Sequence, residues 1–99
     1  MNLQGMMQQA QKLQKDMMKE KKQIEEKVFT KKMSFVEVEV NGKKEILKIK
    51  IDKDVSLEKE DIEMLEDTVM LVINGIFKEI DKETEQKMSK FGSGVNGLF

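Results

Sequence analysis

The sequence predicts a single α+β domain over residues 1–99, with a long N-terminal helix, a three-stranded antiparallel sheet and a long C-terminal helix. Three observations predict this fold. Apolar residues recur at heptad spacing near the N-terminus, alternate with charged residues on both sides of Asn41-Gly42, and form a wide helical stripe from residue 62 onward. A chain of this length buries only a modest core, so a dimer interface would help to stabilise it.

The N-terminal helix is predicted by apolar residues spaced three and four apart. These residues are Leu3, Met6, Ala10, Leu13, Met17 and Ile24. Such spacing places them on one seam, as in a heptad repeat, while Gln and Lys fill most other positions. No proline, and no glycine after Gly5, interrupts the pattern, so we expect one helix from Leu3 to Glu26. We interpret the seam as ordinary helix packing, which its methionines make adaptable.

Three strands are predicted directly after this helix. Residues 28–30 form a short β-type run that predicts a first strand, and residues 31–34 are expected to be a connection. The next two strands flank Asn41-Gly42, the dipeptide typical of a hairpin turn. Valines 36, 38 and 40 share one face of the second strand, and Leu47, Ile49 and Ile51 share one face of the third. Both a two-residue and a four-residue loop place these faces opposite each other, and we expect the helices to cover them.

The second long helix is predicted from Lys59 to Lys90, with a wide apolar stripe up to Ile80 that is typical of packing on a sheet. Gly75 inside this helix indicates a kink or a close contact, and Gly92 indicates its end. Residues 92–99 are expected to be a flexible tail. Both helices are too long for the sheet, so their excess lengths should run antiparallel as an arm. The methionine-rich N-terminus would then lie near Met88 and Phe91.

Composition excludes several classes of function. The chain has no Cys and no His, which removes zinc fingers, thiol chemistry and most catalytic constellations. The acidic run in residues 52–67 lacks the spacing of a calcium-binding loop, so we expect no metal, cofactor or small-molecule substrate. We expect a non-enzyme. No apolar run is long enough to span a membrane, and no signal peptide is evident. A soluble cytoplasmic protein is therefore expected.

The charge distribution favours a polyanion as partner, although the net charge is −1. Residues 1–34 hold eight lysines and four acidic residues, whereas residues 52–67 hold two lysines and eight acidic residues. All cations are Lys, which meets phosphate as a point charge, and Gln can pair with adenine. Because Arg is absent, we expect modest sequence specificity. The candidate DNA-binding residues are Gln4, Gln8, Gln11, Lys12, Lys15, Lys19, Lys22, Lys31, Lys32, Lys78, Lys82, Lys87 and Lys90.

The sequence resembles the YbaB/EbfC family of bacterial nucleoid-associated proteins. The residues that carry the resemblance come in this order: MMQQAQKLQ at 6–14, the hairpin VEVEVNG at 36–42, IKID at 49–52, and EMLED at 63–67, followed by Asn74. The resemblance implies a tweezer-like homodimer that binds double-stranded DNA with helical arms, resides in the nucleoid and influences gene expression. The chain departs from the family in residues 31–34, where relatives often have glycines, and in its short tail.

An alternative hypothesis is a dimeric interaction scaffold that binds another protein through its methionine seam and does not bind nucleic acid. Salt dependence separates the two hypotheses, because affinity for DNA through lysine–phosphate contacts falls steeply as salt rises. A single-stranded nucleic acid partner is disfavoured, since the few phenylalanines fit a core better than a stacking platform. A membrane-surface helix is disfavoured by the Gln-rich flanks of the seam.

Overall fold

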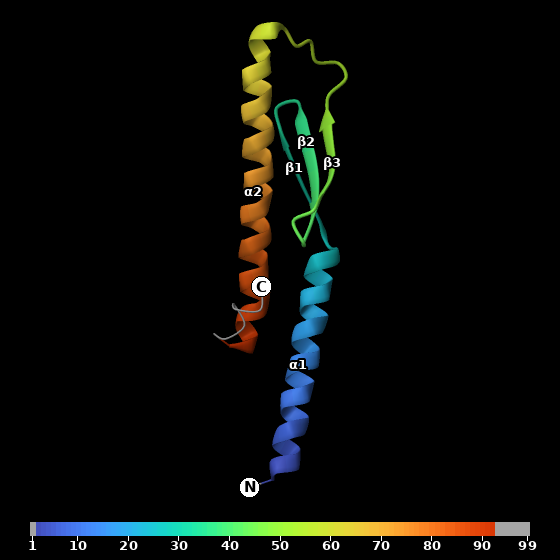
Figure 1. Cartoon of the computed structure of the whole chain (residues 1–99), viewed down its shortest axis with the longest axis vertical. Helices are drawn as coiled ribbons and strands as arrows, with labels where there is room; N and C mark the ends of the chain where they lie inside the picture. Colours follow the sequence, from blue (N-terminus) through green and yellow to red (C-terminus); the bar gives the residue numbers. More distant parts are fainter. Residues whose placement is uncertain (1, 93–99) are drawn as a thin grey trace.

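The structure is a computed structural model and describes residues 2–92. The elements are α1 (Leu3–Glu26), β1 (Val28–Met33), β2 (Val36–Asn41), β3 (Ile46–Ile51), the 3-10 turn η1 (Lys59–Asp61), α2 (Ile62–Met88) and the 3-10 turn η2 (Ser89–Phe91). α2 runs beside the sheet, while α1 extends past the end of α2 (Figure 1), so the molecule measures 72 × 20 × 14 Å. This order of elements confirms the predicted fold class.

α1 has the bounds that the heptad spacing predicted. At its start, the Asn2 side-chain oxygen accepts a hydrogen bond from the Gly5 N–H at 3.1 Å. This contact satisfies one of the backbone donors that a helix leaves free at its N-terminus. At its end, Lys27 takes an extended conformation (φ −70°, ψ 139°) and leads straight into β1.

β1 is longer than predicted. It pairs with β2 along its whole length, from Val28 opposite Asn41 to Met33 opposite Val36. Only Ser34 and Phe35 separate the two strands, and Ser34 takes the left-handed φ of 55° that such a tight turn requires. The expectation that residues 31–34 form a connection was therefore wrong. Nothing in the run from Lys31 signals a strand, because it begins with two charged lysines and lacks the β-branched residues typical of strands.

The hairpin between β2 and β3 uses a four-residue loop, residues 42–45. The Asn41 N–H donates to the Glu45 carbonyl at 3.0 Å, and Lys44 takes the positive φ of 66°. A bulge at Glu39/Val40 shifts the register, so Val40 lies opposite Ile46 rather than Leu47. The predicted pairing of the valine face with Ile49 and Ile51 is confirmed.

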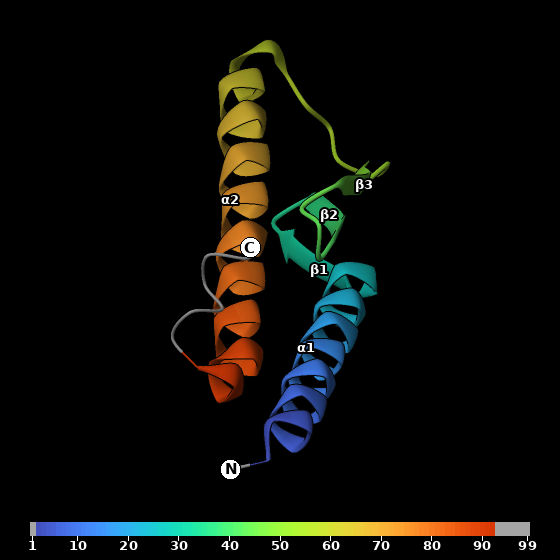
Figure 2. The same cartoon turned by 60° about the horizontal axis from the view of Figure 1, so that its bottom comes forward.

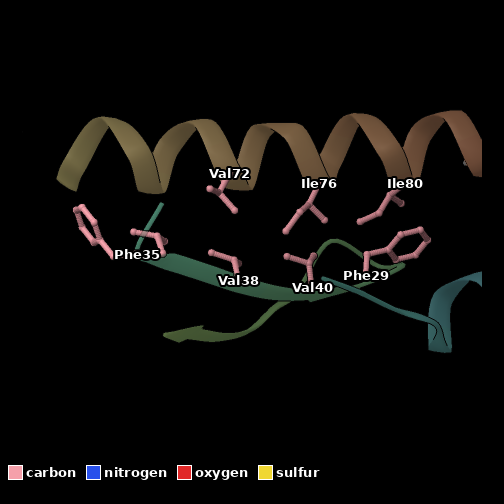
Figure 3. Close-up of a cluster of buried hydrophobic side chains, with 8 residues drawn as sticks. Phe29, Phe35, Val38, Val40, Val72, Ile76 and Ile80 are labelled. Carbon is pink, nitrogen blue, oxygen red and sulfur yellow. The ribbon is translucent and has the colours of Figure 1, made fainter. Parts of the chain in front are cut away.

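The core lies between α2 and the inner face of the sheet (Figure 3). Val38 and Val40 are fully buried and point toward Val72 and Ile76 of α2. Phe29 and Phe35 are also buried and belong to the same cluster. Residues four apart lie on one face of a helix. The distance along α2 between Val72, Ile76 and Ile80 is therefore similar to the distance along β2 between every second residue, so each can pack against a valine of the strand.

α2 covers β1 and β2 but not β3. In Figure 2, β3 is the strand farthest from the helix, and α2 packs against β1 and β2. All six residues of β3 are exposed, including Ile49, which keeps 47% of its surface accessible although it pairs with buried Val38. The expectation that the helices cover the whole apolar face was therefore wrong for β3.

α2 and its flanking turns span the predicted second helix. At its start, the Glu58 N–H donates to the Asp61 side chain at 2.9 Å. A Cβ on Gly75 would meet the end of the Lys31 side chain at 3.2 Å, which is the close contact that this glycine indicated. Gly92 has φ 102° and follows η2, as predicted for a helix end. Of the predicted tail, residues 93–99 lie outside the described part of the chain.

The two helices meet over a short length only. Ile24 of α1 and Met88 of α2 are both buried, and Met17 and Phe91 pack against them. Lys90 donates a hydrogen bond to the Glu20 carboxylate at 2.9 Å. The expected contact of Met88 and Phe91 with the methionine-rich N-terminus was wrong. α2 ends beside the last half of α1, so the first half of α1 projects beyond it (Figure 1).

Candidate nucleic-acid interface

The polar face of α1 gathers all seven of its predicted DNA-binding residues. In an α-helix each residue turns the chain by about 100°. Gln4, Gln8, Gln11, Lys12, Lys15, Lys19 and Lys22 therefore share one side of α1. Ile24 and Met17, which pack against the end of α2, lie on the opposite side. We call the side that carries the lysines the outer face of α1.

The lysines of the outer face are available to a ligand. All four are exposed. None of them forms an ion pair or a side-chain hydrogen bond with any of residues 2–92. No carboxylate occupies these ammonium groups, so the four side chains form an exposed cationic stripe along the helix that can contact phosphate.

Four other predicted lysines are engaged inside the fold. Lys31 pairs with Glu79 at 3.3 Å, and Lys32 pairs with Asp52 at 3.5 Å, so both hold the sheet to neighbouring segments. Lys87 lies 3.9 Å from Glu83 and Lys90 lies 2.9 Å from Glu20. In each of these pairs the carboxylate offsets part of the attraction between the lysine and a phosphate. The structure thus separates these lysines from the outer face of α1.

The contact between α1 and α2 shifts the pKa of Glu20. The hydrogen bond from Lys90 holds the pKa of the Glu20 carboxyl below its ordinary value of 4.5, with smaller contributions from the charges of Lys90, Lys87 and Lys19. Partial burial acts in the opposite direction. The Glu20 carboxylate is therefore charged at neutral pH. Its ion pair with Lys90 links α1 to the end of α2.

The last two predicted lysines, Lys78 and Lys82, lie on α2. Both are exposed, and neither forms an ion pair within the described residues. They follow Ile76 and Ile80 by two positions, about 200° around the helix, and therefore point away from the sheet. They are separate from the outer face of α1 within one chain.

The hairpin loop adds a lysine that the sequence analysis did not select. Lys43 and Lys44 line a hollow of about 290 Å³ together with Lys21 of α1. Lys44 pairs with Asp81 at 2.7 Å, whereas Lys43 is exposed. The loop therefore brings Lys43 close to the basic second half of α1. The signal in the sequence was the pair of lysines directly after Asn41-Gly42.

Charge is segregated along the long axis of the molecule. The acidic segment of residues 52–67 includes the loop after β3 and the start of α2, which lie at the end opposite to the N-terminus of α1 (Figure 1). The first described residues, 2–11, carry no charged side chain. A polyanion that approached along α1 would meet glutamines first, then lysines, and would stay far from the acidic end.

Among residues 2–92 no group of three or more acidic side chains could hold a metal ion. No helix in this part of the chain is long and apolar enough to cross a membrane.

Comparisons with known proteins identify a family, several relatives and a solved structure of the same fold. Residues 1–95 match the YbaB/EbfC DNA-binding family. A nucleoid-associated protein of Clostridium novyi is 42% identical over an alignment that covers 100% of this chain and 90% of the relative. One of Lactococcus lactis is 40% identical over 96% of this chain and 97% of the relative. The crystal structure of an uncharacterized protein from Helicobacter pylori has the same fold. It aligns with a TM-score of 0.71 and 19% identity and covers 100% of this chain and 99% of that one.

Proposed function

Because the chain belongs to the YbaB/EbfC DNA-binding family, we propose that it is a nucleoid-associated protein that binds double-stranded DNA as a homodimer and contributes to nucleoid organisation and gene regulation. The observation that carries this proposal is the outer face of α1. It presents four lysines, all exposed and free of ion pairs within the described residues, in line with three glutamines.

The length of this face suits a duplex. From Gln4 to Lys22 the helix rises about 27 Å at 1.5 Å per residue. Successive base pairs are about 3.4 Å apart, so the face spans roughly eight of them. The lysines meet phosphate oxygens, which supplies affinity without sequence information. The uncharged glutamines near the tip reach base edges, where Gln pairs best with adenine. Lys43 of the hairpin loop adds one more phosphate contact near the base of the arm.

The surface left open by α2 supports the homodimer. The inner side of β3 exposes Ile46, Ile49 and Ile51, each with more than a third of its surface accessible. On α2 the apolar side chains of Ile62 and Met70 are exposed as well. Soluble monomers rarely expose so much apolar surface in one place, and a small domain has few other sources of stability. A second copy that covers β3 would extend the core and hold two α1 arms on one body.

The proposal is tested by the salt dependence of duplex binding. Each phosphate contact contributes about −0.9 to the slope of log affinity against log salt. Replacing Lys12 and Lys19 with Gln should therefore reduce the slope by about 1.8 for each arm in contact with DNA. Replacing Lys53 and Lys59 with Gln removes the same charge at the acidic end and should leave affinity nearly unchanged.

Equal effects of the two double variants would contradict the assignment of the arm, since only net charge would then matter. A wild-type protein that fails to bind duplex DNA at low salt would contradict the function itself. That result would favour the alternative, a scaffold that binds another protein.

A further inference from the structure

The projecting first half of α1 carries one exposed apolar side chain that the packing of the helices does not explain. Met7 keeps 57% of its surface accessible and lies about 80° around the helix from Met17, which packs against α2. Its neighbours are Gln4 and Gln11, because residues three and four apart adjoin on a helix surface. Gln8, four residues after Gln4, completes the group. We call Gln4, Met7, Gln8 and Gln11 the tip cluster.

The tip cluster is open to a ligand. All four side chains are exposed. None of the three glutamines forms a side-chain hydrogen bond with any of residues 2–92. This part of α1 projects beyond the end of α2 (Figure 1). A helix about 10–12 Å across fits a DNA major groove about 12 Å wide, but not a minor groove about 6 Å wide. The tip can therefore reach base edges in the major groove.

The chemistry of the cluster matches one kind of base pair. In the major groove adenine presents an acceptor and a donor, which one glutamine amide satisfies with two hydrogen bonds, and thymine presents a methyl group. Guanine presents two acceptors, so the amide oxygen of a glutamine would face one of them, and cytosine has no methyl group. Arg and Lys, which read guanine, do not occur in residues 2–11. A thioether set between amides therefore suits A·T and not G·C.

We propose that the tip cluster reads A·T base pairs in the major groove, with glutamines on adenine and Met7 on the methyl group of a thymine. From Gln4 to Gln11 the helix rises about 10 Å, or about three base-pair steps. The lysines from Lys12 onward then meet phosphates and hold the helix in register. This inference rests on the proposed function, because it assigns the bases that the same arm selects.

Duplexes with altered bases test this readout on the intact protein. The wild type should bind an A·T duplex at least about tenfold more tightly than a G·C duplex. A duplex of hypoxanthine and cytosine has the minor-groove pattern of A·T and the major-groove pattern of G·C, so it should bind as weakly as G·C. Replacing thymine with uracil removes only methyl groups and should weaken binding about fourfold for each methyl in contact.

Single variants separate the roles within the cluster. Met7→Ala should bind the thymine and uracil duplexes equally. Met6→Ala is the matched control, because it removes the same side chain from the side of Met17 and should keep the wild-type ratio. Replacing Gln4 and Gln8 with Ala should reduce the preference for A·T over G·C and leave the salt dependence unchanged, since every lysine remains.

The failure of this inference is distinguishable from the failure of the proposed function. Equal affinity of the wild type for A·T and G·C duplexes, with a steep salt dependence, would overturn the readout and leave duplex binding intact. Tight binding of the hypoxanthine duplex would place the readout in the minor groove and overturn it as well. A Met7→Ala protein that still distinguishes thymine from uracil would refute the methyl contact. Absence of binding to every duplex would contradict the proposed function itself.

Discussion

The junction between α1 and the sheet depends on Gly42, and replacing this residue with Ala tests the fold most sharply. A Cβ at position 42 would lie 1.7 Å from the Ile24 carbonyl oxygen and 2.5 Å from its carbonyl carbon. It would also lie 2.9 Å from the Glu25 Cα. All three atoms belong to the backbone of α1, so no side-chain rotation can relieve the contact. The hairpin loop and the end of α1 must move apart.

The size of the effect follows from this geometry. An ordinary van der Waals contact begins at 3.4 Å, so the gap has to open by about 1.7 Å. The Gly42 N–H donates to the Lys27 carbonyl at 3.0 Å, and such a shift would break this hydrogen bond. Losing the bond costs about 1 kcal/mol, and overpacking costs about 1–3 kcal/mol. We therefore expect the free energy of unfolding to fall by about 3 kcal/mol. For a domain of this size that lowers the melting temperature by about 12–24 °C.

Thermal unfolding followed by circular dichroism measures this change. Gly75→Ala is the matched control, because its Cβ would meet only the movable end of Lys31 at 3.2 Å. Ala is better than Gly inside a helix by about 1 kcal/mol, so this variant should melt at the same temperature or a few degrees higher. A Gly42→Ala variant as stable as the wild type would refute the close packing of the hairpin loop on α1.

Two further predictions concern association and pH. Ile49→Lys places a charge in the exposed apolar surface of β3 and should give a monomer of 11.5 kDa by light scattering, while the wild type should have twice that mass if the proposed dimer forms. Thr30→Lys adds the same charge to an exposed position of β1 and should leave the dimer intact. The Glu20–Lys90 contact stabilises the pairing of α1 and α2 above pH 4.5 and loses this effect as pH falls through the lowered pKa of Glu20. The protection of the amides of residues 17–24, corrected for the intrinsic pH dependence of amide exchange, should therefore fall in acid in the wild type, and less so in Glu20→Gln.

Each of these two predictions can be contradicted by a specific result. An Ile49→Lys protein that keeps the wild-type mass would move the dimer interface away from β3, provided that its circular dichroism is native. If Glu20→Gln and the wild type respond to acid in the same way, the Lys90 contact does not contribute to the pairing of the helices.

The regular elements could be predicted from the sequence because they follow from local periodicity. The heptad spacing placed α1 at Leu3–Glu26, and the alternation around Asn41-Gly42 placed β2 and β3. The tight turn at Ser34 could not be predicted in this way. Ser34 has a positive φ, and a serine does not indicate that conformation as a glycine or an asparagine would. The bulge that exchanges Leu47 for Ile46 is likewise a property of the pair of strands and not of either strand alone.

What the sequence could not provide is the tertiary placement of charge and of apolar surface. Lys90 follows the end of α2 and could have belonged to a free face, yet the packing of α2 on α1 brings it to Glu20. The apolar side of β3 was predictable, but its exposure follows from the position of α2 over β1 and β2. The outer face of α1 could be predicted in full, because helical spacing alone determines it.

Photo-cross-linking from single cysteines tests the central claim most directly. A photoreactive group attached at Gln8→Cys lies on the outer face of α1, and one at Ser56→Cys lies in the exposed acidic loop at the far end of the molecule. We predict that duplex DNA becomes joined to the Gln8→Cys protein and not to the Ser56→Cys protein. Comparable yields from both sites, or a higher yield from Ser56→Cys, would contradict the assignment of α1 as the arm that holds DNA.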